Sequence, residues 1–177
     1  MKNFKYILTI LFFTLFSSTV YSETTIAVLD VVKLLKESKA AVSMKDQLNT
    51  VAKKYTDEDL KKQKEIQKQE EELLRQKATL TPEAFSDRKN TFEKKVIEFN
   101  KGSQSKRRAL AKAEKEAVTQ IEDEVEKIVK AIIDSDKITA VFRKSAIILG
   151  DTSIDITEKV VEELNKKLST VTVKVTP

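Results

Sequence analysis

The side chains that could do chemistry in this 177-residue chain are almost all charged. The sequence contains 33 Lys and Arg and 28 Asp and Glu, but no His and no Cys. These absences rule out a cysteine nucleophile, a Ser-His-Asp triad, a His/Cys metal site and any disulfide. The two glycines, Gly102 and Gly150, stand too far apart to form a Gly-rich phosphate or dinucleotide loop. We therefore expect neither enzymatic activity nor a bound cofactor.

Two acidic runs, residues 70–72 and 122–124, are the remaining candidates for a calcium site or a catalytic carboxylate pair. Both runs fall in segments with helical periodicity. Consecutive residues on a helix fan out around its axis, so the carboxylates of neither run converge on one point. We assign no metal site and no catalytic residue.

Basic side chains are concentrated in one block of the sequence. Residues 73–112 contain 11 basic and 4 acidic residues, a net charge of +7, whereas residues 113–134 carry a net charge of −4. A segregated basic patch attracts anionic partners, such as acidic lipid head groups, lipopolysaccharide or acidic proteins. The alternative is that the charges only solubilise a long helix. The predicted contacts are Arg75, Lys77, Arg88 and Lys89.

A long helical hairpin has to position these side chains. Residues 40–77 contain no Gly or Pro, and Ser38 is the predicted N-cap of this first helix. Thr81 can cap a second helix, with Pro82 at its first position, and that helix is predicted to run to about residue 134. We predict an arm over residues 42–134, about 55 Å long, with its turn near residues 78–82.

Four apolar residues recur along one face of the second helix. Phe85, Phe92 and Phe99 are spaced by seven, and Val96 lies beside them. Heptad-like spacing predicts a narrow seam against another helix. We favour the seam, with contact to a polypeptide held in a cavity as the alternative, and partial exposure would serve both roles.

Short apolar segments on both sides of the arm predict a small body. Residues 25–30 are typical of a strand, and residues 31–37 of two helical turns. Residues 138–142 and 146–149 are predicted to be two further strands, joined as a hairpin by the three residues between them.

A last helix and a tail segment complete the predicted body. Asp155 is the candidate cap of the helix, with Glu158 three residues on, and the apolar face is formed by Val160, Val161, Leu164 and Leu168. Residues 169–177, which we call the tail segment, alternate valine with polar residues. This alternation fits either a frayed tail or an added edge strand.

The small size of the body predicts a homo-oligomer. Without the first 22 residues and the arm, 62 residues remain. Domains below about 70–80 residues rarely build a sufficient core alone, and the short strands leave edges that need pairing. The predicted body and oligomer interface consists of Ile26, Val28, Ile138, Val141, Ile147 and Leu149.

The first 22 residues have the layout of a secretory signal peptide. A basic start is followed by an apolar run at residues 6–16, and Val20 and Ser22 precede the predicted cleavage before Glu23. An uncleaved anchor is the alternative, but an 11-residue run is short against the ~20 residues of a membrane span. We expect an exported, soluble product.

The order of these segments resembles the Skp (OmpH-like) family of periplasmic chaperones. The resemblance is carried by residues 26–30 (IAVLD), 34–38 (LLKES), 138–142 (ITAVF) and 155–157 (DIT), with the Lys/Glu-rich hairpin between them. It covers essentially the whole mature chain. One departure lies at residues 39–41 (KAA), where relatives often carry Pro and Gly.

The predicted fold is mostly α with a small β body (α+β). The resemblance implies a jellyfish-like homotrimer in the periplasm, whose three arms enclose a cavity. It also implies an ATP-independent holdase that binds unfolded outer-membrane proteins, prevents their aggregation and carries them towards the outer membrane. The alternative is a coiled-coil envelope adaptor or tether that binds a folded partner. Nucleic acid is not an expected partner, because residues 106–108 (KRR) lack interleaved aromatic side chains.

Overall fold

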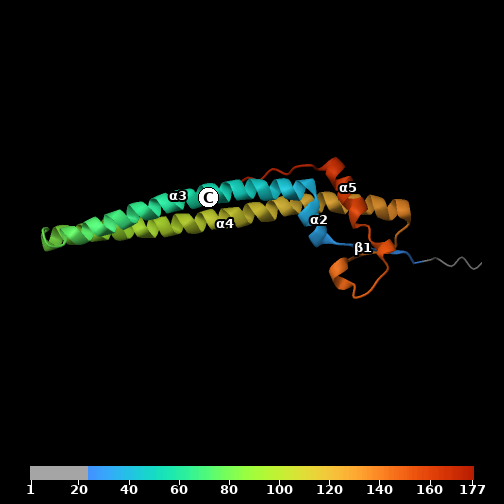
Figure 1. Ribbon diagram of the computed structural model, residues 1–177, viewed down its shortest axis with the longest axis horizontal. Helices are drawn as coiled ribbons and strands as arrows, with labels where there is room; N and C mark the ends of the chain where they lie inside the picture. The colour runs from blue at the N-terminus through green and yellow to red at the C-terminus, as the bar shows by residue number, and fades with distance from the viewer. Residues whose placement is uncertain (1–23) are drawn as a thin grey trace, which may run out of the picture.

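The computed structural model describes residues 24–177. The predicted signal peptide and its cleavage site lie outside the described residues. A long helical arm projects from a small body at one end of the molecule (Figure 1). The elements are β1 (Ile26–Leu29), α2 (Val31–Glu37), α3 (Lys39–Gln76), α4 (Pro82–Asp136), β2 (Ala140–Arg143) and α5 (Thr157–Lys167), with 3-10 turns at Lys144–Ala146 and Thr152–Ile154.

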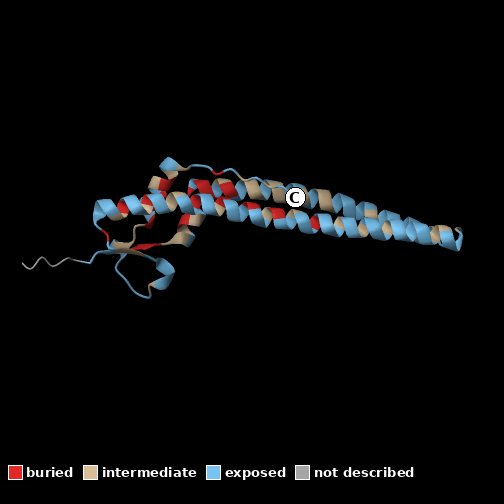
Figure 2. Cartoon of the chain, turned by 180° about the vertical axis from the view of Figure 1, so that it is seen from behind, coloured by how far each residue is buried: buried red, intermediate tan, exposed pale blue. Residues whose placement is uncertain are grey.

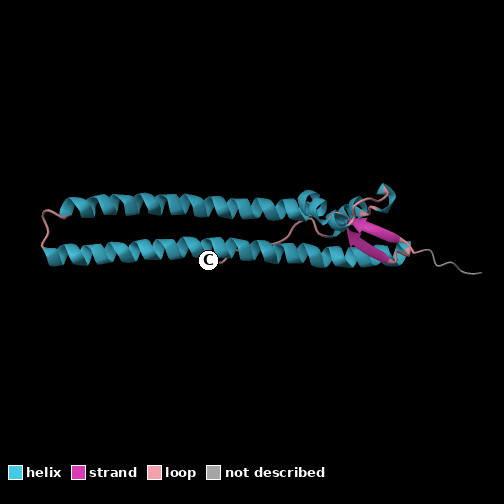
Figure 3. Ribbon diagram, turned by 90° about the horizontal axis from the view of Figure 1, so that it is seen from below, coloured by secondary structure: helices cyan, strands magenta, loops and turns pink. Residues whose placement is uncertain are grey.

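The two arm helices begin at the predicted caps. The Ser38 hydroxyl accepts the N–H of Ala41 at 3.4 Å, and the Thr81 hydroxyl accepts the N–H of Ala84 at 3.3 Å. Each cap satisfies a backbone donor that the first turn of a helix leaves without an intrahelical partner. The two helices run side by side from the turn to the body, and α4 continues past the start of α3 (Figure 3). The predicted hairpin is confirmed.

The body is organised around β1, and one prediction for it is wrong. β2 pairs with β1 in parallel, with Ile26 opposite Ala140, and Asp155 bridges Val28 on the same strand. Residues 146–149 form no strand, because the chain turns through Lys144–Ala146 instead of forming the predicted hairpin. The local sequence offered a hairpin partner to residues 138–142, but the long crossover through the arm brings them to β1.

The predicted N-cap of α5 is also wrong by one residue. Asp155 lies before the helix and accepts the N–H of Thr157 at 2.9 Å, while Ile156 occupies the N-cap position. Glu158, predicted to complete the cap three residues after Asp155, accepts no backbone N–H of the first turn among the described hydrogen bonds, and its carboxylate instead binds Lys33 of α2. The predicted apolar face is confirmed: Val160, Val161 and Leu164 are buried and Leu168 is half-buried.

The core is confined to the body and the base of the arm (Figure 2). Leu34 of α2, Ile121 and Ile128 of α4, and Val160 and Leu164 of α5 are almost completely buried. Within α3 the buried residues are Ala40, Ala41 and Met44, all in its first two turns. The body and the arm base therefore share one apolar core, and the distal arm projects from it.

Candidate functional site

The base of the arm is a tightly packed seam. Ala109, Ala113, Ala117 and Ile121 follow one another every fourth residue of α4 and are all buried. Small residues on one face of a helix let a neighbouring helix approach closely, and dense packing of this kind leaves few voids. The base seam therefore holds the two arm helices in one fixed arrangement.

The middle of the arm is joined by a charged cluster. The Lys106 Nζ atom lies 2.8 Å from a Glu58 carboxylate oxygen, 2.9 Å from an Asp59 carboxylate oxygen and 5.1 Å from the centre of the Tyr55 ring. The Lys106 side chain is only 15% exposed. Its hydrogen bonds lower the pKa of both Glu58 and Asp59. A lysine attracted to two carboxylates and an aromatic face joins α3 to α4 in place of apolar packing.

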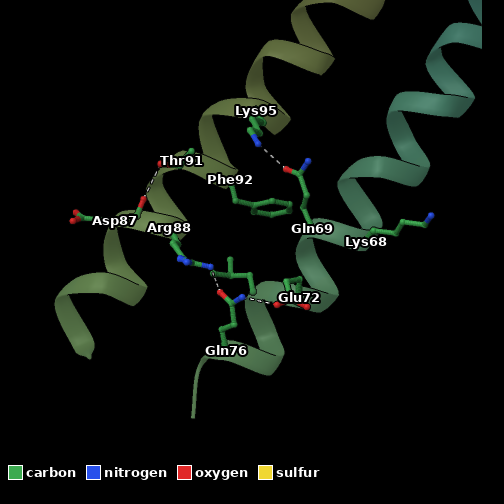
Figure 4. Close-up of a pocket in the computed structure, with 10 residues that line it drawn as sticks. Lys68, Gln69, Glu72, Gln76, Asp87, Arg88, Thr91, Phe92 and Lys95 are labelled. Carbon is green, nitrogen blue, oxygen red and sulfur yellow. Dashed lines mark hydrogen bonds between the residues drawn. The ribbon is translucent and has the colours of Figure 1, made fainter. Parts of the chain in front are cut away.

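The phenylalanine series lies beyond this cluster. Phe85, Phe92, Val96 and Phe99 are all half-buried. Phe92 points into the space between the two helices, where it lines a groove of about 590 Å³ with Leu73 (Figure 4). Phe99 lines a second groove of about 320 Å³ with Ile66. The Phe92 and Phe99 rings thus belong to the seam, while the grooves beside them keep part of each of these two rings within reach of another molecule.

The four basic residues predicted as anion contacts all lie near the turn of the arm. Arg75 pairs with Glu72 at 3.3 Å on its own helix, and Lys89 pairs with Glu93 at 3.6 Å. Arg88 donates to the Gln76 side-chain oxygen across the two helices (Figure 4). Lys77 is exposed at the end of α3. Their contact with an anionic partner remains a prediction.

The cross-links between the helices are symmetric about Pro82, which the sequence reading did not use. Gln76 and Arg88 each lie 6 residues from Pro82. Gln69 and Lys95, whose polar atoms are 3.0 Å apart, each lie 13 residues from it. Glu58 and Lys106 each lie 24 residues from it. Folding the sequence back about Pro82 places Lys106 beside Glu58, whereas folding it about residue 80, the midpoint of the predicted turn, places Lys106 beside Lys54.

The base of the arm also carries an open apolar groove of about 970 Å³. It is lined by residues of α2, α3 and α4 that include Val32, Leu35, Met44 and Leu110, and Val32 is 76% exposed. The apolar lining offers a surface that another chain could cover.

The residues predicted as the oligomer interface occupy two environments. Val28 and Ile138 are buried inside the body of this chain, and Val141 and Ile147 are half-buried. Ile26 and Leu149 are exposed, Leu149 by 92%. Only the exposed members are free to meet a second copy without a rearrangement, and the interface remains a prediction.

Asp155 joins three elements of the body. The Asp155 carboxylate accepts a hydrogen bond of 2.8 Å from the Lys144 Nζ atom and another from the hydroxyl of the buried Thr157. The Thr157 hydroxyl in turn accepts the Asp30 N–H at 2.8 Å. Burial alone would raise the pKa of Asp155, but Lys144 and Thr157 outweigh it and lower the pKa to about 2. These hydrogen bonds join the 3-10 turn at Lys144–Ala146 to the start of α5.

Known proteins resemble this chain along most of its length. The family model described as "Outer membrane protein (OmpH-like)" matches residues 25–164. An uncharacterized protein of Aquifex aeolicus (strain VF5) is 30% identical over 148 residues, which cover 79% of this chain and 85% of that protein. The family match ends within α5 and does not include the tail segment.

A solved structure has the same fold. It is the crystal structure of a proposed outer membrane chaperone (OmpH-like) from Caulobacter crescentus CB15. The two chains superimpose with a TM-score of 0.80 at 16% sequence identity, over 87% of this chain and 91% of that one. The likeness extends over both the arm and the body. In the described part of this chain, residues 24–177, we find no helix with both the length and the apolarity of a membrane span.

Proposed function

The chain belongs to the OmpH-like family, and from this membership we propose that it is an ATP-independent holdase chaperone of the periplasm. Its clients are unfolded outer-membrane proteins, which it keeps from aggregating and carries towards the outer membrane. The proposed location rests on the signal peptide predicted from the first 22 residues. The protein acts by binding alone and catalyses no reaction.

The half-buried aromatic seam of the distal arm is the observation that carries this proposal. An unfolded barrel protein exposes alternating apolar strands, which aggregate edge to edge. Phe92 and Phe99 line shallow grooves flanked by charged side chains, so each offers a small apolar contact in a well-hydrated setting. Many such weak contacts retain a flexible client through multivalency, without fixing one conformation.

We propose that three copies assemble through their bodies, with the arms enclosing the client. Exposed apolar side chains on the body support this assembly. Ile148 is 96% exposed, Leu149 is 92% exposed and Phe142 is 46% exposed. Exposed apolar side chains that gather into one patch mark protein–protein contact sites, and we propose these three as members of such a patch. Anionic lipid or lipopolysaccharide is a proposed second partner, bound at the basic tip by Arg75, Lys77, Arg88 and Lys89.

The test dilutes a urea-unfolded outer-membrane barrel into buffer and follows turbidity without ATP. We expect the chain starting at residue 23 to suppress turbidity, and we expect the suppression to saturate near one client per assembly. If turbidity is unchanged while the protein is folded and oligomeric, the holdase proposal fails and an adaptor that binds a folded partner becomes the working hypothesis.

A matched pair of variants links assembly to this activity. Leu149→Lys adds a charge to the exposed apolar surface, and Thr152→Lys adds the same charge at an exposed position nearby. We expect Leu149→Lys alone to dissociate the assembly, measured by light scattering, and to raise the concentration needed to suppress turbidity. An intact assembly in the Leu149→Lys variant would contradict the proposed interface.

A further inference from the structure

The tail segment is docked on the arm, which neither sequence alternative described. It runs back from α5 along the base of the hairpin in an extended conformation (Figure 1). Val171 is 5% exposed and Val173 and Val175 are half-buried, while Thr172, Lys174 and Thr176 between them are exposed. The segment thus has the alternating faces of a β-strand, although no described strand pairs with it.

A single side chain of α3 holds the backbone of this segment. The Gln47 Nε2 atom donates to the Val171 carbonyl oxygen at 2.7 Å, and the Gln47 Oε1 atom accepts the Val173 N–H at 3.2 Å. Nε2 also donates to the Ser43 hydroxyl at 3.1 Å, which orients the amide. Gln47 therefore presents one donor and one acceptor to the tail, as the backbone of a neighbouring strand would.

The contacts define the ligand by its backbone and by the spacing of its side chains. The Gln47 amide binds carbonyl and N–H groups that every residue except proline carries. The arm surface buries Val171 and receives Val173, two residues on, as part of the same apolar cluster. The chemistry recognised is an extended polypeptide with apolar residues at alternate positions.

We propose that the face of α3 around Gln47 is a docking site for extended, alternately apolar segments of unfolded clients, and that the tail segment occupies this site until a client displaces it. The inference rests on the proposed function, because outer-membrane strands have this alternating pattern. It adds a site at the base of the arm, held by a segment that the family match does not include.

The tail acts as an internal competitor in this arrangement. A tethered segment reaches an effective concentration of about millimolar. If the site is open for about a tenth of the time, the apparent affinity of any external strand is reduced about tenfold. A client with many strands overcomes this competition more readily than a single short peptide does.

The first test uses a fluorescent peptide with the sequence of residues 169–177 (STVTVKVTP) and needs no client. Val171→Asp puts a charge into the buried contact and releases the tail, whereas Thr172→Asp adds the same charge to the exposed face. We expect the peptide to bind the Val171→Asp chain about tenfold more tightly than the wild-type or Thr172→Asp chain. A peptide of the same composition with its three valines made consecutive should bind weakly to all three.

A second variant checks the role of the Gln47 amide. Gln47→Glu preserves the shape of the side chain but removes the donor to the Val171 carbonyl. Added to Val171→Asp, it should abolish the gain in peptide binding, while Asn49→Asp, an exposed position on the same helix, should leave the gain intact. Equal peptide affinity in the wild-type and Val171→Asp chains, or a gain that survives Gln47→Glu, would overturn the proposal.

Clients are brought in last, so that the two proposals can fail separately. Hydrogen exchange at the Val173 amide, which is bonded to Gln47, reports tail docking. We expect saturating urea-unfolded barrel protein to accelerate this exchange at least tenfold. If turbidity is suppressed but Val173 exchange is unchanged, the client site is wrong and the holdase stands. If turbidity is not suppressed but the peptide results hold, the holdase fails and strand binding at Gln47 stands.

Discussion

The base and the distal half of the arm are built from the same two helices but from different seams. At the base, Ala113, Ala117 and Ile121 are buried, and Ala117 and Ile121 belong to the core that the arm base shares with the body. In the distal half, Phe92 and Phe99 are only half-buried, and Lys106 with its two carboxylate partners marks the boundary. One hairpin thus combines a buried seam with a half-buried one.

The difference assigns separate tasks to the two halves. Buried apolar packing fixes geometry, because cavities and overpacking in a dense core both cost free energy. Half-buried side chains and exposed ion pairs contribute less and tolerate more than one arrangement. The base therefore sets the direction of the arm, and the distal half retains apolar surface that the proposed client would contact.

The largest expected effect on stability comes from shortening one isoleucine side chain to alanine in each seam. Ile121→Ala at the base should lower the free energy of unfolding by about 3 kcal/mol, because Ile121 is fully buried. Ile66→Ala, at a half-buried distal position, should cost about 1 kcal/mol or less. Urea denaturation followed by circular dichroism measures both values. Equal costs would remove the distinction between the seams.

Acid should act next most strongly, through Asp155 in the body. The folded pKa of about 2 lies below the ordinary value of 3.8, so the ionised carboxylate stabilises the folded state. The contribution is fully present above about pH 5 and is lost as the pH falls from about 4 to about 2, and it amounts to about 2 kcal/mol. Asp155→Asn should remove most of it at neutral pH.

The control for this titration is Glu162→Gln, which neutralises an exposed carboxylate on α5. Melting temperatures are measured from pH 7 to pH 2. The difference between the wild-type and Asp155→Asn chains should shrink as the pH falls, while the wild-type and Glu162→Gln chains should melt at similar temperatures throughout. A constant gap between wild type and Asp155→Asn across this range would assign the effect to packing and not to charge.

Lys106→Met should have a smaller and more local effect. Methionine retains an unbranched apolar stem but leaves Glu58 and Asp59 without the cation that both bind. We expect a loss of about 1 kcal/mol and an increase of about fivefold in backbone hydrogen exchange, confined to the distal arm. Lys115→Met, at an exposed position of α4, is the control. Faster exchange throughout the base seam would show that the halves are coupled.

The smallest effect on stability is expected at the tip. Simultaneous replacement of Arg75, Lys77, Arg88 and Lys89 by Glu should change the free energy of unfolding by about 0.5 kcal/mol or less. Binding to vesicles that contain anionic lipid, measured by co-sedimentation, should nevertheless fall and lose its salt dependence. Reversal of four exposed lysines between residues 45 and 64 is the matched control. Unchanged vesicle binding in the tip variant would withdraw the tip as an anion contact.

The sequence predicted the arm because its signals are local. Ser38, Thr81 and Pro82 define where the helices begin, and the seven-residue spacing of phenylalanine defines the face that meets the other helix. In the sequence Lys106 is one of three consecutive basic residues, and a hairpin register is needed to see that it faces Glu58. The register is centred on Pro82 and not on the midpoint of the predicted turn.

The body was less predictable because its pairings join distant segments. In the sequence β1 precedes the whole arm and β2 follows it, although the two strands pair in space. The local apolar run at residues 146–149 was therefore a misleading partner for residues 138–142. The tail segment has a strand pattern without a strand, and its partner is a glutamine side chain. A periodicity of two predicts which side chains are buried, but not the group that satisfies the backbone.

The symmetry of the cross-links about Pro82 restricts how such an arm can change in length. An insertion in α3 between the base seam and Glu58 would displace every pair distal to it while the base seam holds, and Lys106 would lose Glu58 and Asp59. A matched insertion of seven residues in both helices would preserve each pair and its face while lengthening the arm by about 10 Å. Over evolutionary time, arm length in this architecture can therefore grow or shrink only in paired steps that keep the register, and under the proposed function these steps would set the range of client sizes.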